Sequence, residues 1–184
     1  MNITQSPTRE KFPLSRRKIF KKTISSVLVW FFLLAIYDAM LIFGAVTGND
    51  DVWFPAVLKI VFITILVLAF ISFLTYLYQR WYFAVYFYDL TDKYIIIKKG
   101  PITPHEITIP YERVQDVYVD QDLWDRILGI YDVHLSSATA TSGMEAHIDG
   151  VRKPAADGLR ELLLSTIHEK LNKKQNVSNI QTNI

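Results

Sequence analysis

Two long apolar stretches decide the fold of this chain: residues 24–46, ISSVLVWFFLLAIYDAMLIFGAV, and residues 54–78, FPAVLKIVFITILVLAFISFLTYLY. Each stretch holds a single charged residue, Asp38 in the first and Lys59 in the second. A helix of about 20 apolar residues is long enough to cross the hydrocarbon core of a bilayer. The remainder of this 184-residue chain is too small to bury two such helices in a soluble core. We therefore predict transmembrane helices at residues 24–46 and 54–80.

The distribution of positive charge predicts the orientation of these helices. Residues 1–23 hold seven Lys and Arg against one Glu, whereas residues 47–53 hold no Lys or Arg and carry two Asp. Lys and Arg favour the cytoplasmic side of a membrane. We predict a multi-pass protein of the cell membrane, with a basic cytoplasmic arm at 1–23, a short external loop at 47–53 and both termini in the cytoplasm.

Basic and aromatic residues flank the two apolar stretches, and such residues favour the membrane–water interface. The predicted interfacial anchors are Arg16, Arg17, Lys18, Lys21, Lys22, Tyr78, Arg80, Trp81 and Tyr82. The aromatic cluster continues to Tyr88. A lipid-binding aromatic site is one interpretation of this cluster, and anchoring combined with core packing is the other.

The two charges inside the apolar stretches need partners, because an isolated charge in lipid costs several kcal/mol. At a helical rise of about 1.5 Å per residue, Asp38 and Lys59 lie roughly 12 Å and 8 Å from the same membrane face. One hypothesis pairs the two side chains across the helical hairpin and so sets its register. In the alternative, Lys59 extends outward to the interface and Asp38 bonds to a partner helix.

Residues 81–171 show short alternating patterns separated by turn residues, which predict a β-rich cytoplasmic domain. Expected strands lie near 94–99, 106–109, 114–119, 130–138 and 146–148. After Pro154, apolar residues recur at helical spacing through Leu159, Leu163 and Ile167, so we expect a C-terminal helix that covers the domain. The polar residues 172–184 are predicted to form a disordered tail.

Four motifs in this order are similar to those of the bacterial pleckstrin-homology-like membrane proteins, the YdbS-like group. They are YDLT at 88–91, YIIIKKG at 94–100, IPYERVQDV at 109–117 and LWDRILG at 123–129. The resemblance covers residues 24 to about 171. It implies an α+β membrane protein whose transmembrane hairpin precedes a PH-like split β-barrel of about seven strands, capped by a C-terminal α-helix. It also implies that the protein has no catalytic residues and acts with a related multi-helix membrane partner.

The residues themselves point to no catalytic or metal-binding chemistry. The absence of cysteine excludes disulfides, thiolate metal sites and cysteine nucleophiles. Phosphate-binding glycine loops, GxSxG and helical paired-histidine motifs are missing. His134 and His147 could meet across a hairpin near Asp149, but we expect them to be surface or rim residues. We therefore expect no enzyme activity, no metal, no cofactor and no small-molecule substrate.

Charge also limits the classes of partner. Residues 80–154 hold eight Lys and Arg against eleven Asp and Glu, whereas nucleic-acid binding needs a basic folded surface. We therefore expect no nucleic-acid partner.

Trp124 stands in an acidic segment with Asp120, Asp122 and Asp125, a composition typical of an interface anchor with a polar rim. The alternative is that Trp124 packs into the core of a helical turn.

These observations lead to one predicted function and two alternatives. We expect a membrane-anchored scaffold that assembles with other membrane proteins, or with itself, in envelope homeostasis or defence. The first alternative is a domain that senses lipid head groups, and the second is a small subunit of a transporter.

Overall fold

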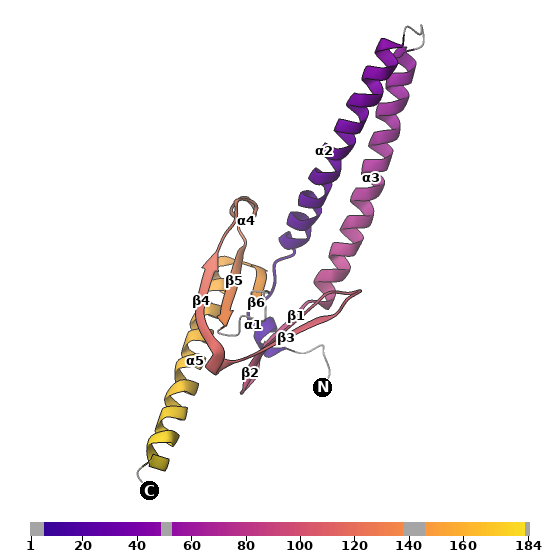
Figure 1. The fold of residues 1–184 in the computed structure, drawn as a ribbon. Coiled ribbons are helices and arrows are strands. Elements are labelled where there is room, and N and C mark those ends of the chain that lie inside the picture. Colours follow the sequence, from indigo (N-terminus) through magenta and orange to yellow (C-terminus); the bar gives the residue numbers. More distant parts are fainter. Residues whose placement is uncertain (1–5, 49–52, 138–145, 183–184) are drawn as a thin grey trace. The chain divides into compact units, whose positions relative to one another are not determined.

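The computed structural model describes residues 6–48, 53–137 and 146–182, and it divides the chain into two compact units (Figure 1). One unit, here called the helical hairpin, holds residues 19–81. The other, here called the β domain, holds the N-terminal residues up to Lys18 and everything from Tyr82 onward.

The helical hairpin consists of two long helices that run side by side (Figure 1). They are α2, Arg17–Thr47, and α3, Trp53–Val85. Each is long and apolar enough to cross a membrane, and its most apolar segment is not buried within the protein. The predicted loop at 47–53 falls largely on residues 49–52, which lie outside the described residues.

The polar contact inside the hairpin differs from the charge pair that one of the two hypotheses proposed. The Thr64 hydroxyl donates a hydrogen bond to Asp38 Oδ1 at 2.9 Å, and Asp38 and Lys59 form no ion pair in this described part of the chain. The prediction considered depth only. Residues 59 and 64 are about 140° apart around a helix with 3.6 residues per turn, so a face that presents Thr64 to α2 turns Lys59 away.

The β domain contains six strands among the described residues, arranged in two antiparallel three-stranded sheets. The first sheet holds β1, Phe87–Leu90, β2, Tyr94–Lys99, and β3, His105–Pro110, and the second holds β4, Val114–Asp120, β5, Tyr131–Ser137, and β6, Ala146–Val151. The α+β class is confirmed. The predicted split β-barrel of about seven strands is corrected to six strands among the described residues, in two sheets that do not close into one barrel.

The break between the sheets has a local cause. Pro110 ends β3 and has no N–H to donate to a neighbouring strand. The following 3₁₀ turn, η1, Tyr111–Arg113, then redirects the chain before β4 begins at Val114. Residues 138–145, which include most of the predicted polar loop after β5, lie outside the described residues.

The C-terminal helix α5, Lys153–Thr182, packs against β4, β5 and η1, as its apolar stripe predicts. Leu159 and Leu163 are fully buried and Ile167 nearly so. The helix also extends into the segment 172–184, for which the sequence predicts disorder. Propagating a helix that is already anchored adds one hydrogen bond per residue without a new nucleation step, which is why polar residues can continue it.

Residues 6–18, here called the strap, fold onto the β domain although the sequence suggests only a basic arm. The strap begins with the short helix α1, Pro7–Lys11, capped by the Ser6 side chain. The Ser6 hydroxyl donates to the Tyr88 carbonyl at 2.6 Å, and the Tyr88 hydroxyl donates to the Phe12 carbonyl. These bonds tie both ends of α1 to β1.

The second half of the strap runs along β6. Leu14 forms an antiparallel bridge with Val151, and the Ser15 N–H donates to the Gly150 carbonyl at 2.7 Å. Phe12 is buried against α5 at Gly158, where an added Cβ would approach its ring to 2.6 Å. The strap is therefore part of the domain core.

Three buried tyrosines predict that the β domain loses stability in alkali. Burial raises the pKa of Tyr86 and Tyr88 far above the ordinary value and raises that of Tyr111 to about 12. Because an unfolded phenol ionises near pH 10, the stability from these neutral phenols is complete below about pH 10 and declines as pH rises toward the folded values. Absorbance titration should show these three phenols ionising above pH 10. Their ionisation near pH 10 would contradict this expectation.

Candidate functional site

A buried ion cluster joins the strap to β6. Lys18 Nζ lies 2.7 Å from Asp149 Oδ2, and both residues are buried. His147 Nε2 lies 2.7 Å from the other oxygen of Asp149, and Lys99 Nζ lies 3.9 Å from it. The Lys18 ammonium also sits 4.2 Å from the centre of the Tyr86 ring, a cation–π distance.

This cluster clamps the chain where α2 begins. Lys18 is the second residue of α2, and Asp149 lies on β6, 131 residues away in the chain. Gly150, with a φ of 74°, brings the β6 backbone so close that an added Cβ would lie 2.8 Å from Lys18 Cβ. The Tyr86 hydroxyl donates to the His147 carbonyl at 3.0 Å and completes the clamp. Its chemistry is that of a structural ion pair.

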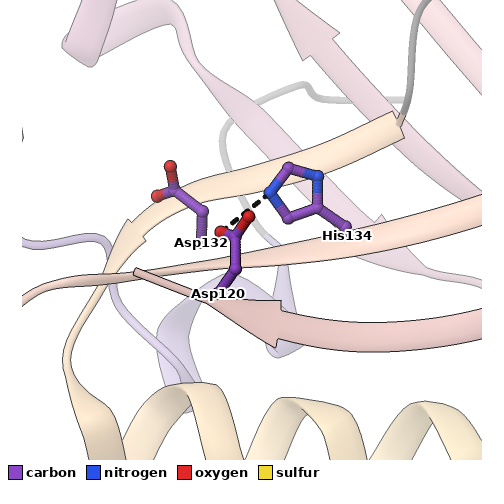
Figure 2. A group of neighbouring side chains, drawn as sticks. All are labelled: Asp120, Asp132 and His134. Atoms are coloured by element: carbon purple, nitrogen blue, oxygen red, sulfur yellow. Dashed lines mark hydrogen bonds and ion pairs between the residues drawn. The ribbon is translucent and has the colours of Figure 1, made fainter. Parts of the chain in front are cut away.

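A second polar group lies on the exposed side of the sheet formed by β4, β5 and β6. Asp120, Asp132 and His134 place one potential ligand atom each within 4.8 Å of one another (Figure 2). Strand register explains the group, because Asp120 pairs with Asp132 and Tyr118 pairs with His134. His134 Nε2 lies 3.1 Å from Asp120 Oδ1, and Asp132 Oδ1 accepts from the Gly150 N–H at 2.6 Å.

His134 also takes part in a stack of rings. Its ring lies 4.9 Å from that of Tyr118, nearly parallel to it, and 5.4 Å from that of His147. His134 and His147 are partners in the β5–β6 register, so they do meet across these strands. With these neighbours the Asp120, Asp132 and His134 group is held by protein contacts, and we assign it no metal.

The predicted interface residues lie in or next to the short helix α4, Leu123–Leu128, which connects β4 to β5. Asp122 is its N-cap and Asp125 its third residue, and each carboxylate accepts from the other's backbone N–H in a capping box. Asp125 is buried, so its carboxylate serves the helix. Trp124 and Asp120 are exposed, and neither forms part of the hydrophobic core.

The predicted membrane anchors have different environments. Lys18 is buried in the ion cluster, and Tyr82 packs against the core of the β domain with its ring 6.3 Å from that of Tyr86. Lys21 is also buried. The remaining predicted anchors are exposed: Arg16, Arg17, Lys22, Tyr78, Arg80 and Trp81.

An arginine-lined pocket is the feature that the sequence did not reveal. It has a volume of about 330 Å³ and is lined by Pro13, Leu14, Ser15, Arg16, Arg17 and Arg152. Arg152 immediately follows β6, so the bridge between Leu14 and Val151 brings it to the strap. In the sequence, only the adjacent Arg16 and Arg17 could have indicated this site, because Arg152 lies more than a hundred residues away.

Comparison with known proteins identifies the family. No curated protein and no solved structure gives a significant match to the chain. The family model described as Bacterial PH domain matches residues 23–167, which include the apolar stretches of both long helices, all six described strands and the first half of α5. The whole strap lies before this match. The chain therefore belongs to the bacterial PH domain family.

Proposed function

We propose that this protein is a non-enzymatic interaction module, anchored in the cell membrane by α2 and α3, that assembles with other membrane proteins through its cytoplasmic β domain. The family match carries the proposal, because it spans the apolar helices and the β domain together and PH-like domains are generally non-catalytic. The helices support anchoring, since each exposes large apolar side chains over most of its length. The basic residues before the apolar stretch of α2 favour a cytoplasmic β domain.

The surface that we propose for the partner is the outer strand β4. It forms one edge of its sheet, and Asp116, Tyr118 and Asp120 are exposed along it. Edge strands accept an added strand from another protein, and charged side chains along the edge limit which strands can pair. An aromatic residue among acidic ones suits a partner segment that carries basic residues.

Photocrosslinking from the two matched tyrosines tests this assignment. Tyr118 is 36% exposed on β4 and Tyr94 is 38% exposed at the start of β2, so Tyr94 provides a control of equal accessibility. A photoreactive phenylalanine analogue at position 118 preserves an aromatic ring that can stack on His134. In intact membranes, we expect position 118 to form a covalent adduct with another membrane protein and position 94 to form none.

Two results would contradict the proposal. Equal adducts from both positions, or none from position 118, would exclude β4 as the partner surface. Release of the full chain into the supernatant by alkaline carbonate, which strips peripheral proteins from membranes, would exclude the anchoring role of α2 and α3.

A further inference from the structure

The surface of α4 is unusually apolar for an exposed turn. Leu123 and Ile127 are 77% and 72% exposed, the highest values for large apolar side chains among the described residues of the β domain. Their spacing of four residues places them on one face of the helix. Trp124, 37% exposed, adds to this apolar area. Single exposed apolar residues are common, but an adjacent group of three is typical of a surface that contacts lipid or another protein.

The exposure of these side chains is built into the turn. The capping box between Asp122 and Asp125 fixes the start of α4 and directs Asp125 inward, where it is only 1% exposed. Gly129, with a φ of 62°, ends the helix in a left-handed conformation. The Gln121 amide donates to the Ile130 carbonyl at 3.1 Å and closes the base of the turn. Because both ends are fixed, Leu123 and Ile127 stay on the outer face.

Arg17 ties α4 to the beginning of α2. Its Nη1 donates to the Leu128 carbonyl at 2.7 Å, and an added Cβ on Gly129 would lie 3.4 Å from the same nitrogen. Arg17 is the first residue of α2 and precedes the apolar stretch 24–46 by seven residues. The connecting residues therefore keep Arg17 within about 10 Å of the start of that stretch if they are helical. Even if they were fully extended, the distance could not exceed about 25 Å.

The arginine-lined pocket lies beside the hydrogen bond between Arg17 and the Leu128 carbonyl, because Arg17 takes part in both. None of its six lining residues is acidic, and within the described residues Arg16 and Arg152 form no ion pair. Three arginines line this pocket of about 330 Å³, and arginine side chains favour an anion that offers several oxygens. A phosphate group has this chemistry. A phospholipid head group would present it at the depth where Arg17 must lie if α2 spans the membrane.

We propose that α4 and the arginine-lined pocket together form a bilayer-docking surface. Leu123 and Ile127 enter the boundary between head groups and acyl chains, and Arg16, Arg17 and Arg152 bind the phosphates of anionic lipids. This combination of an apolar face with flanking basic residues is how surface-bound helices attach to membranes. The inference rests on the proposed anchoring by α2 and α3, and it adds a second attachment that holds the β domain against the same bilayer.

Fluorescent labels on the full chain in lipid nanodiscs test the docking surface. The chain has no cysteine, so each introduced cysteine carries the only label. Ile127→Cys reports on α4. Ile102→Cys is a matched control, because Ile102 is 68% exposed in the turn between β2 and β3, and Phe62→Cys reports on α3. We expect brominated lipid to quench labels 127 and 62 but not 102, and aqueous iodide to quench 102 alone.

Each other outcome has a distinct meaning. If label 127 behaves like label 102 while label 62 is quenched by lipid, docking is excluded and anchoring stands. If label 62 also escapes lipid quenching, the proposed anchoring itself fails. If label 127 is shielded from both quenchers, a protein or a second copy of the chain covers α4, and the proposed occupant is wrong.

A second pair of variants tests the arginines. In nanodiscs rich in phosphatidylglycerol, the double variant Arg16→Gln/Arg152→Gln should weaken docking at label 127 roughly 30-fold, since each basic residue near an anionic surface contributes about 1 kcal/mol. Arg113→Gln/Arg160→Gln removes the same charge from two other exposed positions and should change docking little. Equal effects of the two pairs would reject the pocket. Release of label 127 from lipid by inorganic phosphate would assign the pocket to soluble phosphate and also overturn the proposal.

Discussion

Replacing Asp149 with asparagine should destabilise the β domain by about 3–5 kcal/mol, because it leaves buried lysine charge without its carboxylate. Lys18 and Lys99 both approach this carboxylate, and Lys18 is only 4% exposed. A small domain has a total free energy of unfolding of about 5–15 kcal/mol. For a marginally stable domain, this loss would remove nearly all of that free energy. Pulse proteolysis of the full chain in detergent, over a series of urea concentrations, measures the unfolding of the β domain.

The matched control is the exposed ion pair between Lys98 and Glu106, whose charged atoms lie 2.9 Å apart. Lys98→Gln should cost no more than about 1 kcal/mol, because water screens this pair. A double-mutant cycle with Lys18→Met and Asp149→Asn should show strong coupling between the two positions. If Asp149→Asn costs no more than Lys98→Gln, the buried cluster does not clamp the strap.

Leu163→Ala should destabilise the β domain by about 2–5 kcal/mol, because it opens a cavity beneath α5. Leu163 is fully buried within the apolar stripe by which α5 packs on the domain. The same urea and proteolysis measurement reports this loss. We also expect α5 to become sensitive to protease at lower urea concentrations than the strands, since its docking depends on few side chains.

Two variants on the same helix serve as controls. Glu161 is exposed, and Glu161→Ala should change stability by no more than about 0.5 kcal/mol. Leu163→Met nearly preserves the volume of the side chain and should cost less than about 1.5 kcal/mol. A cost for Leu163→Ala as small as that for Glu161→Ala would mean that α5 is not packed on the core.

The sequence was most informative where a feature depends on neighbouring residues. The apolar runs predicted α2 and α3, and the stripe through Leu159, Leu163 and Ile167 predicted the packing face of α5. Alternation predicted most of the strands. Local composition and periodicity are sufficient here because burial of a helix or strand face repeats along the chain.

The sequence was misleading where a residue had to be matched with a distant one. Asp38 accepts a hydrogen bond from Thr64, a partner that depth alone did not single out, because rotation about the helix axis also decides which side chain faces a neighbouring helix. The predicted single split barrel of about seven strands is replaced by two separate sheets, which part at Pro110 through a missing N–H and a 3₁₀ turn. Asp125 looked like an exposed interface residue, but its hydrogen bonds make it an internal cap.

By itself, then, the sequence determined two helices of bilayer length, a β-rich domain and its covering helix, because each follows from repeated local burial. Only the tertiary structure decided that the strap belongs to the domain core, that Lys18 meets Asp149 and that Arg152 joins Arg16 and Arg17. Such meetings depend on how separate elements pack, and no periodicity in the chain encodes the partner of a residue more than a hundred positions away.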